Sequence, residues 1–306
     1  MNVADYISDT SGKDYYIVSR EDLVSIADVI REKAGIDGDL VLPTGIVDAT
    51  DNIVADVSIN DMLTIGLPKI SGNVIFTGTD LPFGAFAGNT GITSFTGNNM
   101  TKVFDRAKFN NAHGCAYTFM NCTNLQAVTM PNVTTFASQD AAFYGCTNLR
   151  TFNIPFERIA SFGGNNAFYN CTHLPSLVLP AFNDNFNQWM FYNCTSMEYV
   201  DVGAGLTGDK SIAANAFNGC SSLDTLIIRG GTNGSRKMTL GNISAFANTP
   251  FASAGTGGTL YVPSALVSTY QSATNWSTIL GYTNNSIQAI EGSIYETQYA
   301  DGTPIT

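Results

Sequence analysis

The 306-residue sequence predicts an α+β repeat solenoid: a short N-terminal helical module, then a stack of coils sharing one parallel β-sheet, then a C-terminal cap. Three observations predict this class. Five cysteines recur at intervals of 23 to 26 residues, a phenylalanine stands three residues before each, and an L-x-x-L-x-L pattern follows each. A unit of this length cannot bury its apolar stripe alone, but it can bury it against a copy of itself.

The first elements expected are two helices. Ser19 is a good N-cap for a helix over residues 20–34, and Gly35 ends that helix. A second, shorter helix is expected from Pro43 to about Ile53. Residues 1–58 would form this module, and residues 59–115 would supply linker strands and degenerate first coils. On the residues alone, the module is an N-terminal cap over the first coil.

The repeats come next. The last two aliphatic positions of each repeat alternate with outward residues, as a strand requires, so each Cys and each Phe should lie over its counterpart in the next coil. The cysteines are Cys122, Cys146, Cys171, Cys194 and Cys220, and the phenylalanines are Phe119, Phe143, Phe168, Phe191 and Phe217. Weaker coils around Phe86 and Phe246 bring the expected number to about seven.

The repeated phrase F-x-x-C-x-x-L-x-x-φ-x-φ-P, strong over residues 116–229, resembles the BspA-type leucine-rich repeats. The resemblance implies a repeat core over residues 116–243 and a last coil with a C-terminal cap over residues 244–306. It also implies that "LYVPSALVSTYQSATNWSTI" is a closing motif. In that motif a helix would begin at Pro263, and apolar side chains would cover the stack: Leu266, Tyr270 and Trp276.

The N-terminal phrase L-x-x-I-A-D-x-I-R-x-K-x-G, followed by L-x-L-P-x-x-I, is similar to a short module of tailed-phage and prophage structural proteins. This resemblance implies that the module docks on a virion and precedes a recognition domain. The docking positions that it implies are Leu23, Ile26, Ala27, Ile30, Arg31, Pro43 and Ile46.

Composition excludes several classes of partner. Fourteen Lys plus Arg against twenty-five Asp plus Glu give a net charge of −11, which argues against nucleic-acid or anionic-membrane binding. The sequence contains no run of eighteen apolar residues, so membrane insertion is not expected. The acidic, polar N-terminus lacks a signal peptide, so we expect synthesis in the host cytoplasm.

We expect neither catalysis nor a cofactor. Each repeated Cys belongs to a different coil, so buried structural thiols are favoured over a metal site or disulfides. A Cys115–His113 nucleophile pair is conceivable, but a turn is the favoured reading. His173 occupies a slot that Asn or Ser fills in sister repeats, which indicates a turn position. No sequence signature of a hydrolase, a zinc protease or a nucleotide-binding loop is present.

The predicted function is that of a non-enzymatic virion structural protein from a tail, a baseplate or a head fibre. Its expected partners are other virion proteins and a host-surface glycan or protein, and a homo-oligomer is expected. On the outward strand face, the residues best able to make contacts are Asn153, Tyr199, Asp201 and Arg229. A BspA-like bacterial surface adhesin and a purely architectural spacer remain as alternatives.

Overall fold

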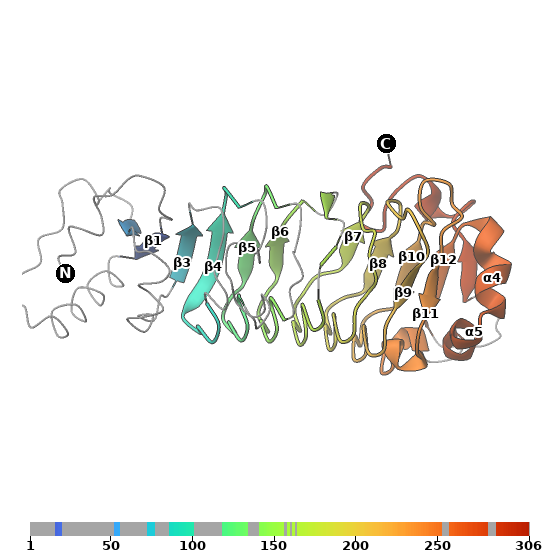
Figure 1. The fold of residues 1–306 in the computed structure, drawn as a ribbon, viewed down its shortest axis with the longest axis horizontal. Coiled ribbons are helices and arrows are strands. Elements are labelled where there is room, and N and C mark those ends of the chain that lie inside the picture. Colours follow the sequence, from blue (N-terminus) through green and yellow to red (C-terminus); the bar gives the residue numbers. More distant parts are fainter. Residues whose placement is uncertain are drawn as a thin grey trace, which may run out of the picture.

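The computed structural model describes residues 72–76, 86–100, 118–133, 141–155, 158–159, 161–162, 164–252, 257–280 and 286–305, and the strands at 16–19 and 52–55. These residues form an elongated stack of coils, with β1 at one end and helices α4 and α5 at the other (Figure 1). The two helices expected over residues 20–34 and 43–53 lie outside the described residues, apart from the end of the second.

Thirteen strands are described, most of them three to five residues long. They are β1 (Tyr16–Ser19), β2 (Asn52–Ala55), β3 (Gly72–Phe76), β4 (Ile92–Gly97), β5 (Ala127–Thr129), β6 (Thr151–Asn153), β7 (Leu177–Leu179), β8 (Tyr199–Val202), β9 (Lys210–Ile212), β10 (Thr225–Ile228), β11 (Met238–Leu240), β12 (Thr259–Val262) and β13 (Ile287–Ala289). Each repeat contributes one strand, β4 to β8 and then β10 and β12, and the strands of neighbouring coils run parallel wherever they pair.

The prediction of one parallel sheet is wrong. Within the described residues the strands form three sheets, in the orders β2-β1-β3-β4-β5-β6, β13-β12-β10-β8-β7 and β11-β9. The long sheet is interrupted between β6 and β7, and Pro175 accounts for this. In sister coils, Arg150 and Asp224 donate from this position to a carbonyl of the preceding coil, at 2.9 and 3.0 Å, but proline has no N–H.

At the N-terminal end the sheet is extended by antiparallel strands. β1 pairs with β3 on one side and with β2 on the other, where Ser19 lies opposite Asn52. Ile53, expected at the end of the second helix, therefore lies in β2. The sequence Asn-Ile-Val-Ala carries two β-branched residues, which favour a strand over a helix end.

The interior of the stack is a column of phenylalanine rings. Neighbouring rings stack nearly parallel, with centroids 5.1 to 5.5 Å apart and interplanar angles of 4 to 10°. The seven rings are those of Phe86, Phe119, Phe143, Phe168, Phe191, Phe217 and Phe246, and they are buried, as are the five repeated cysteines. The prediction that each Phe and Cys lies over its counterpart in a single interior is confirmed.

A tight turn follows each phenylalanine. The residue just before each repeated Cys has a left-handed backbone, with φ between 59° and 81°, and it is always Asn or Gly. Main-chain N–H groups in these turns donate to the next coil, as Phe119 does to Ala142 at 2.8 Å. The turn side of the stack is therefore hydrogen-bonded without a break, even where the sheet is interrupted.

The helical segments whose bounds are described lie in the C-terminal part of the chain. Short 3-10 turns occur at Ile243–Phe246, Pro250–Ala252, Ser264–Leu266 and Ile294–Glu296. The α-helices are α4 (Val267–Ser272) and α5 (Thr274–Leu280), which lie against the last coil (Figure 1). None of the helices in these residues is long and apolar enough to cross a membrane.

Candidate binding surfaces

The outward face of β4 to β7 is open and carries small, uncharged side chains. Its residues are Ser94, Thr96, Ala127, Thr129, Thr151, Asn153 and Val178. Asn153, one of the residues expected to make contacts, is exposed at the end of β6, where its side-chain amide donates to Thr129 Oγ1 at 3.4 Å. The outward side chains of these four strands offer hydroxyl and amide groups to a partner.

The other three residues expected to make contacts lie further along the stack, where the C-terminal segment crosses the strands. Tyr199 and Asp201 are on β8, and Arg229 follows β10 directly. Tyr199 is half-buried, whereas the side chains of Asp201 and Arg229 are only 1% and 9% exposed. Asp201 and Arg229 are occupied by the C-terminal segment of the same chain, so they do not face an open surface.

The two charged side chains form a forked ion pair. Arg229 donates from Nε to Asp201 Oδ1 at 2.7 Å and from Nη2 to Oδ2 at 2.6 Å. Burial raises the pKa of Asp201, while the hydrogen bonds and charge of Arg229 act in the opposite direction. Desolvation of the carboxylate thus opposes the attraction of its partner, as is common for buried ion pairs.

The face formed by the turns carries an aromatic ridge that the sequence analysis missed. Tyr144, Tyr169 and Tyr192 follow three consecutive core phenylalanines, and their rings stack at 4.6 Å with interplanar angles of 4 and 6°. All three are half-buried. Burial raises the pKa of Tyr169, and its two neighbouring phenols raise it further. The repeated dipeptide Phe-Tyr was the sequence signal for this tyrosine ridge.

Beside the ridge, Trp189 adopts a left-handed backbone with φ of 56° and is half-buried. The equivalent positions two residues before the core phenylalanine hold Ala141, Asn166 and Asn215, with φ of 55 to 59°. A bulky residue in this region is strained by about 1 kcal/mol. Tyrosine and tryptophan are the residues most enriched at protein-binding surfaces.

The repeated thiols are arranged for structure. Each donates to the carbonyl of the core phenylalanine in the preceding coil, at 3.0 to 3.3 Å. Burial raises the pKa of Cys122 from 9.0 to about 12, and it raises those of Cys146, Cys171 and Cys194 as well. A thiol kept protonated is a poor nucleophile and a poor metal ligand.

The five described cysteines are free, and the described residues contain no group of three His, Cys, Asp or Glu side chains placed to hold a metal. His173 has its ring Nδ1 2.6 Å from the carbonyl oxygen of Thr147 in the preceding coil, which is a turn contact. Cys115 and His113 lie outside the described residues. So do the docking positions at residues 23–46.

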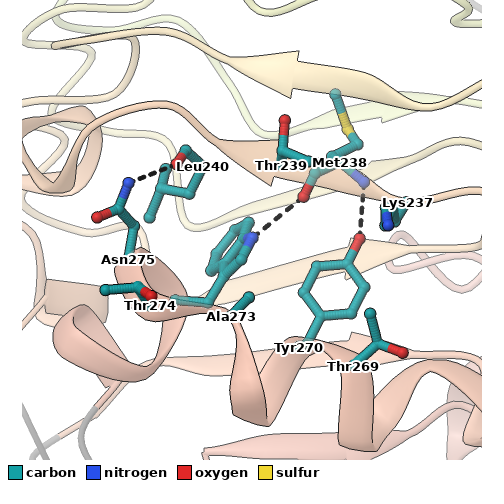
Figure 2. Close-up of a pocket in the computed structure, with 10 residues that line it drawn as sticks. Lys237, Met238, Thr239, Leu240, Thr269, Tyr270, Ala273, Thr274 and Asn275 are labelled. Atoms are coloured by element: carbon teal, nitrogen blue, oxygen red, sulfur yellow. Dashed lines mark hydrogen bonds between the residues drawn. The ribbon is translucent and has the colours of Figure 1, made fainter.

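A pocket of about 200 Å³ lies between β11 and the helices α4 and α5 (Figure 2). Three side chains of the helices bond the outer edge of β11. Tyr270 Oη accepts from the Met238 N–H at 2.8 Å, Trp276 Nε1 donates to the Met238 carbonyl at 3.0 Å, and Asn275 donates to the Leu240 carbonyl at 2.7 Å. These groups replace the bonds that a further strand would make, so the helices close this edge.

The geometry defines the class of protein: a non-globular repeat solenoid whose coils are joined by thiol, amide and main-chain hydrogen bonds. Residues 114–253 match the family model of the BspA type leucine-rich repeat region, in six copies. The match lies where the repeated phrase predicted this family. No curated protein matches the chain.

Several solved structures are similar over part of their length. A leucine rich cell surface protein from Faecalibacterium prausnitzii A2-165 is 20% identical with a TM-score of 0.42, over 60% of this chain and 42% of that one. A leucine-rich repeat protein from Bacteroides ovatus ATCC 8483 is 25% identical with a TM-score of 0.38, over 53% and 37%. The leucine-rich repeat protein TpLRR of T. pallidum is 20% identical with a TM-score of 0.36, over 53% and 65%. The chain therefore spans less than two thirds of each of these proteins.

Proposed function

We propose that the chain is a non-enzymatic binding module that uses an exposed face of its repeat stack to hold a protein or glycan at a surface. The observation that carries the proposal is the tyrosine ridge formed by Tyr144, Tyr169 and Tyr192, because it places three half-exposed aromatic rings in one line. Phenol rings combine a large apolar area with a hydroxyl group, which suits both kinds of partner.

The open sheet face over β4 to β7 is the second candidate surface, because its hydroxyl and amide groups suit polar contacts with a glycan. Two variants distinguish the surfaces. One replaces the three ridge tyrosines by serine, and the other replaces Thr129 and Asn153 by arginine. Binding of each to a glycan array and to intact bacterial cells is compared with binding of the unchanged chain.

If the ridge is the contact surface, its serine variant loses binding while the arginine variant keeps it. The opposite pattern assigns binding to the sheet. Unchanged binding by both variants would place the contact on another surface and count against both candidates. No binding by the unchanged chain would favour the architectural spacer and count against the proposal. Thermal unfolding of each variant checks that the stack is intact.

We further propose that the module works in a virion, docked to other virion proteins by residues 1–58, in a homo-oligomer of a tail, baseplate or head fibre. The N-terminal phrase that includes Ile26, Ile30 and Arg31 supports this role. A BspA-like bacterial surface protein is the alternative, and the repeat family fits it equally well. Neighbouring genes for tail, portal or capsid proteins would favour the virion.

The docking proposal can be tested without damaging the sheet. Ser19 and Asn52 are paired neighbours in β1 and β2. Replacing residues 20–51 by an Asn-Gly turn would therefore join the two strands as a hairpin. We expect this variant to fold but to be missing from purified particles. Normal incorporation would overturn virion docking and leave the binding proposal untouched.

A further inference from the structure

The C-terminal segment, residues 291–305, is bound on the outward face of the sheet as a peptide would be. Arg229 donates from Nη1 to the carbonyl of Tyr295 at 2.8 Å and from Nη2 to the carbonyl of Gln298 at 3.0 Å. Asp201 Oδ2 accepts from the N–H of Ala300 at 2.9 Å. All three of these contacts are made to main-chain groups of the segment.

Aromatic contacts accompany these bonds. The guanidinium of Arg229 lies 4.7 Å from the ring centroid of Tyr299, and the Tyr295 ring meets Tyr261 of β12 edge-on at 4.7 Å. Ile227 of β10 lies between Asp201 and Tyr261 in the strand ladder and is fully buried, although it points away from the interior of the stack. The segment thus crosses β8, β10 and β12 over Ile227.

The binding groups on the sheet are buried, whereas the side chains of the bound segment are not. The described strands β3 to β7 carry no charge on their outward face, yet a buried ion pair stands on the neighbouring strands. Such a pair is costly to desolvate, and here its remaining hydrogen-bonding capacity is used on the segment. By contrast, no side chain of residues 291–305 is buried, and Ile294 and Ile305 are 64% and 37% exposed.

One turn stands at the start of the segment. This turn runs from Ile290 to Ser293 and contains Gly292, whose φ is +82° and around which a Cβ would meet nothing within 4 Å. A segment with no buried side chain opens at a lower cost in free energy than the buried coils do. Reorienting this turn would carry the whole segment away from its own sheet.

We propose that the Asp201–Arg229 pair forms a peptide-binding site that can bind the C-terminal segment of a second copy in place of the segment of the same chain. The exchange would link two chains. The site binds two main-chain carbonyls and one N–H of the segment. A second copy of the chain presents the same three groups. The exposed Ile294 and Ile305 lie on the exchanged segment and would be covered between the two copies.

Two variants of the full chain test the exchange. The first, Arg229→Gln, has a defective site and a free, intact segment. The second combines Tyr299→Ala with Ala300→Pro. These changes remove the ring and the N–H that bind Arg229 and Asp201, so the segment of this variant should leave an intact site empty. We expect their mixture to give a species of twice the mass that each variant shows alone.

The matched control is Arg236→Gln, which removes an exposed arginine from the loop after β10 and should leave the segment on its own sheet. Mixed with the second variant, it should give much less of the heavier species, because its segment is also bound by its own site. Adding Arg229→Gln to the second variant should abolish the complex. A mixture that stays at single mass at the highest soluble concentration, with both variants folded, overturns the proposal.

A second measurement covers the case in which Arg229→Gln does not fold. A fluorescent peptide of residues 291–306 is titrated into the Tyr299→Ala/Ala300→Pro chain and, in parallel, into the unchanged chain. We expect saturable binding that is at least about tenfold tighter to the variant, because its site is not filled in cis. Absence of binding to the folded variant would also overturn the proposal.

Discussion

At the scale of single residues, the repeated cysteine is explained by one hydrogen bond. The carbonyls of five core phenylalanines, from Phe86 to Phe191, accept the thiol of the next coil beside a main-chain N–H, as Phe119 accepts from Cys146 at 3.0 Å and from the Cys122 N–H at 3.1 Å. An alanine would leave the carbonyl without this donor, and a larger apolar residue would displace the ring column. Cysteine fits because it is small, apolar and still able to donate.

Cys146→Ala tests this role. We expect a loss of about 2 kcal/mol in the free energy of unfolding, from one lost hydrogen bond and the space left by the sulfur. Denaturant unfolding followed by circular dichroism measures the loss, and Thr232→Ala, at an exposed loop position, is the control. A loss no larger than that of the control would show that the thiol only fills space.

Alkaline pH should destabilise the stack through the same thiols. The folded pKa of Cys122 is about 12 instead of 9.0, so between these values the unfolded chain releases a proton that the folded chain keeps. The free energy of unfolding therefore falls as pH rises above about 9, by about 1.4 kcal/mol per pH unit for each such thiol. It is unaffected by these groups below that range.

The measurement is the urea midpoint at several values between about pH 8 and 10. Cys122→Ala removes one of the responsible thiols and should make the decline shallower than in the unchanged chain. Equal slopes for the two chains would mean that ionisation of the tyrosines, and not of the thiols, governs the alkaline loss.

At the scale of elements, the outer edge of β11 is closed by side chains instead of a strand. Tyr270→Phe removes the hydroxyl that accepts from the buried Met238 N–H, and we expect it to cost about 1 to 3 kcal/mol. Tyr169→Phe, on the tyrosine ridge, is the matched control and should cost little. Thermal unfolding of both variants measures the difference, and equal costs would mean that water replaces the hydroxyl at β11.

The repeat elements could be predicted because their signal is local. Phe143 and Cys146 are three residues apart and recur in register, so the column and its coil count followed from spacing alone. Pro175 was also visible in the sequence, but its effect depends on which N–H faces the previous coil. Arg229 and Asp201 were recognised as able to make contacts, yet their partners are main-chain groups of residues 295–300, which leave no mark in the sequence.

At the scale of the whole molecule, the stack consists of two sheet blocks that share one interior. Among the described residues, the two blocks are connected across the interruption between β6 and β7 by the turn side, where Thr172 and His173 contact the Thr147 carbonyl, and by the shared core with its ring column. Repeat arrays unfold in units set by their weakest interface. We therefore expect the amides of β4 to β6 to exchange with solvent as one unit and those of β8, β10 and β12 as another.

Native-state hydrogen exchange in low denaturant measures these units. Pro175→Thr restores the missing N–H and should bring the exchange free energies of the two blocks closer together. Arg150→Thr, at the equivalent exposed position of the preceding coil, adds no donor and should leave the two units distinct. A single exchange free energy across β4 to β12 in the unchanged chain would contradict the division.

The direction of the thiol bonds has a consequence for synthesis. Each sulfur, and with it the side-chain amides of Asn124 and Asn148, donates to the coil that precedes it in the chain. As the polypeptide leaves the ribosome, each new thiol finds its acceptor already made, while the main-chain N–H groups of the same turn find theirs in the coil that follows. The thiol and side-chain amide bonds can thus form coil by coil, in the order of synthesis.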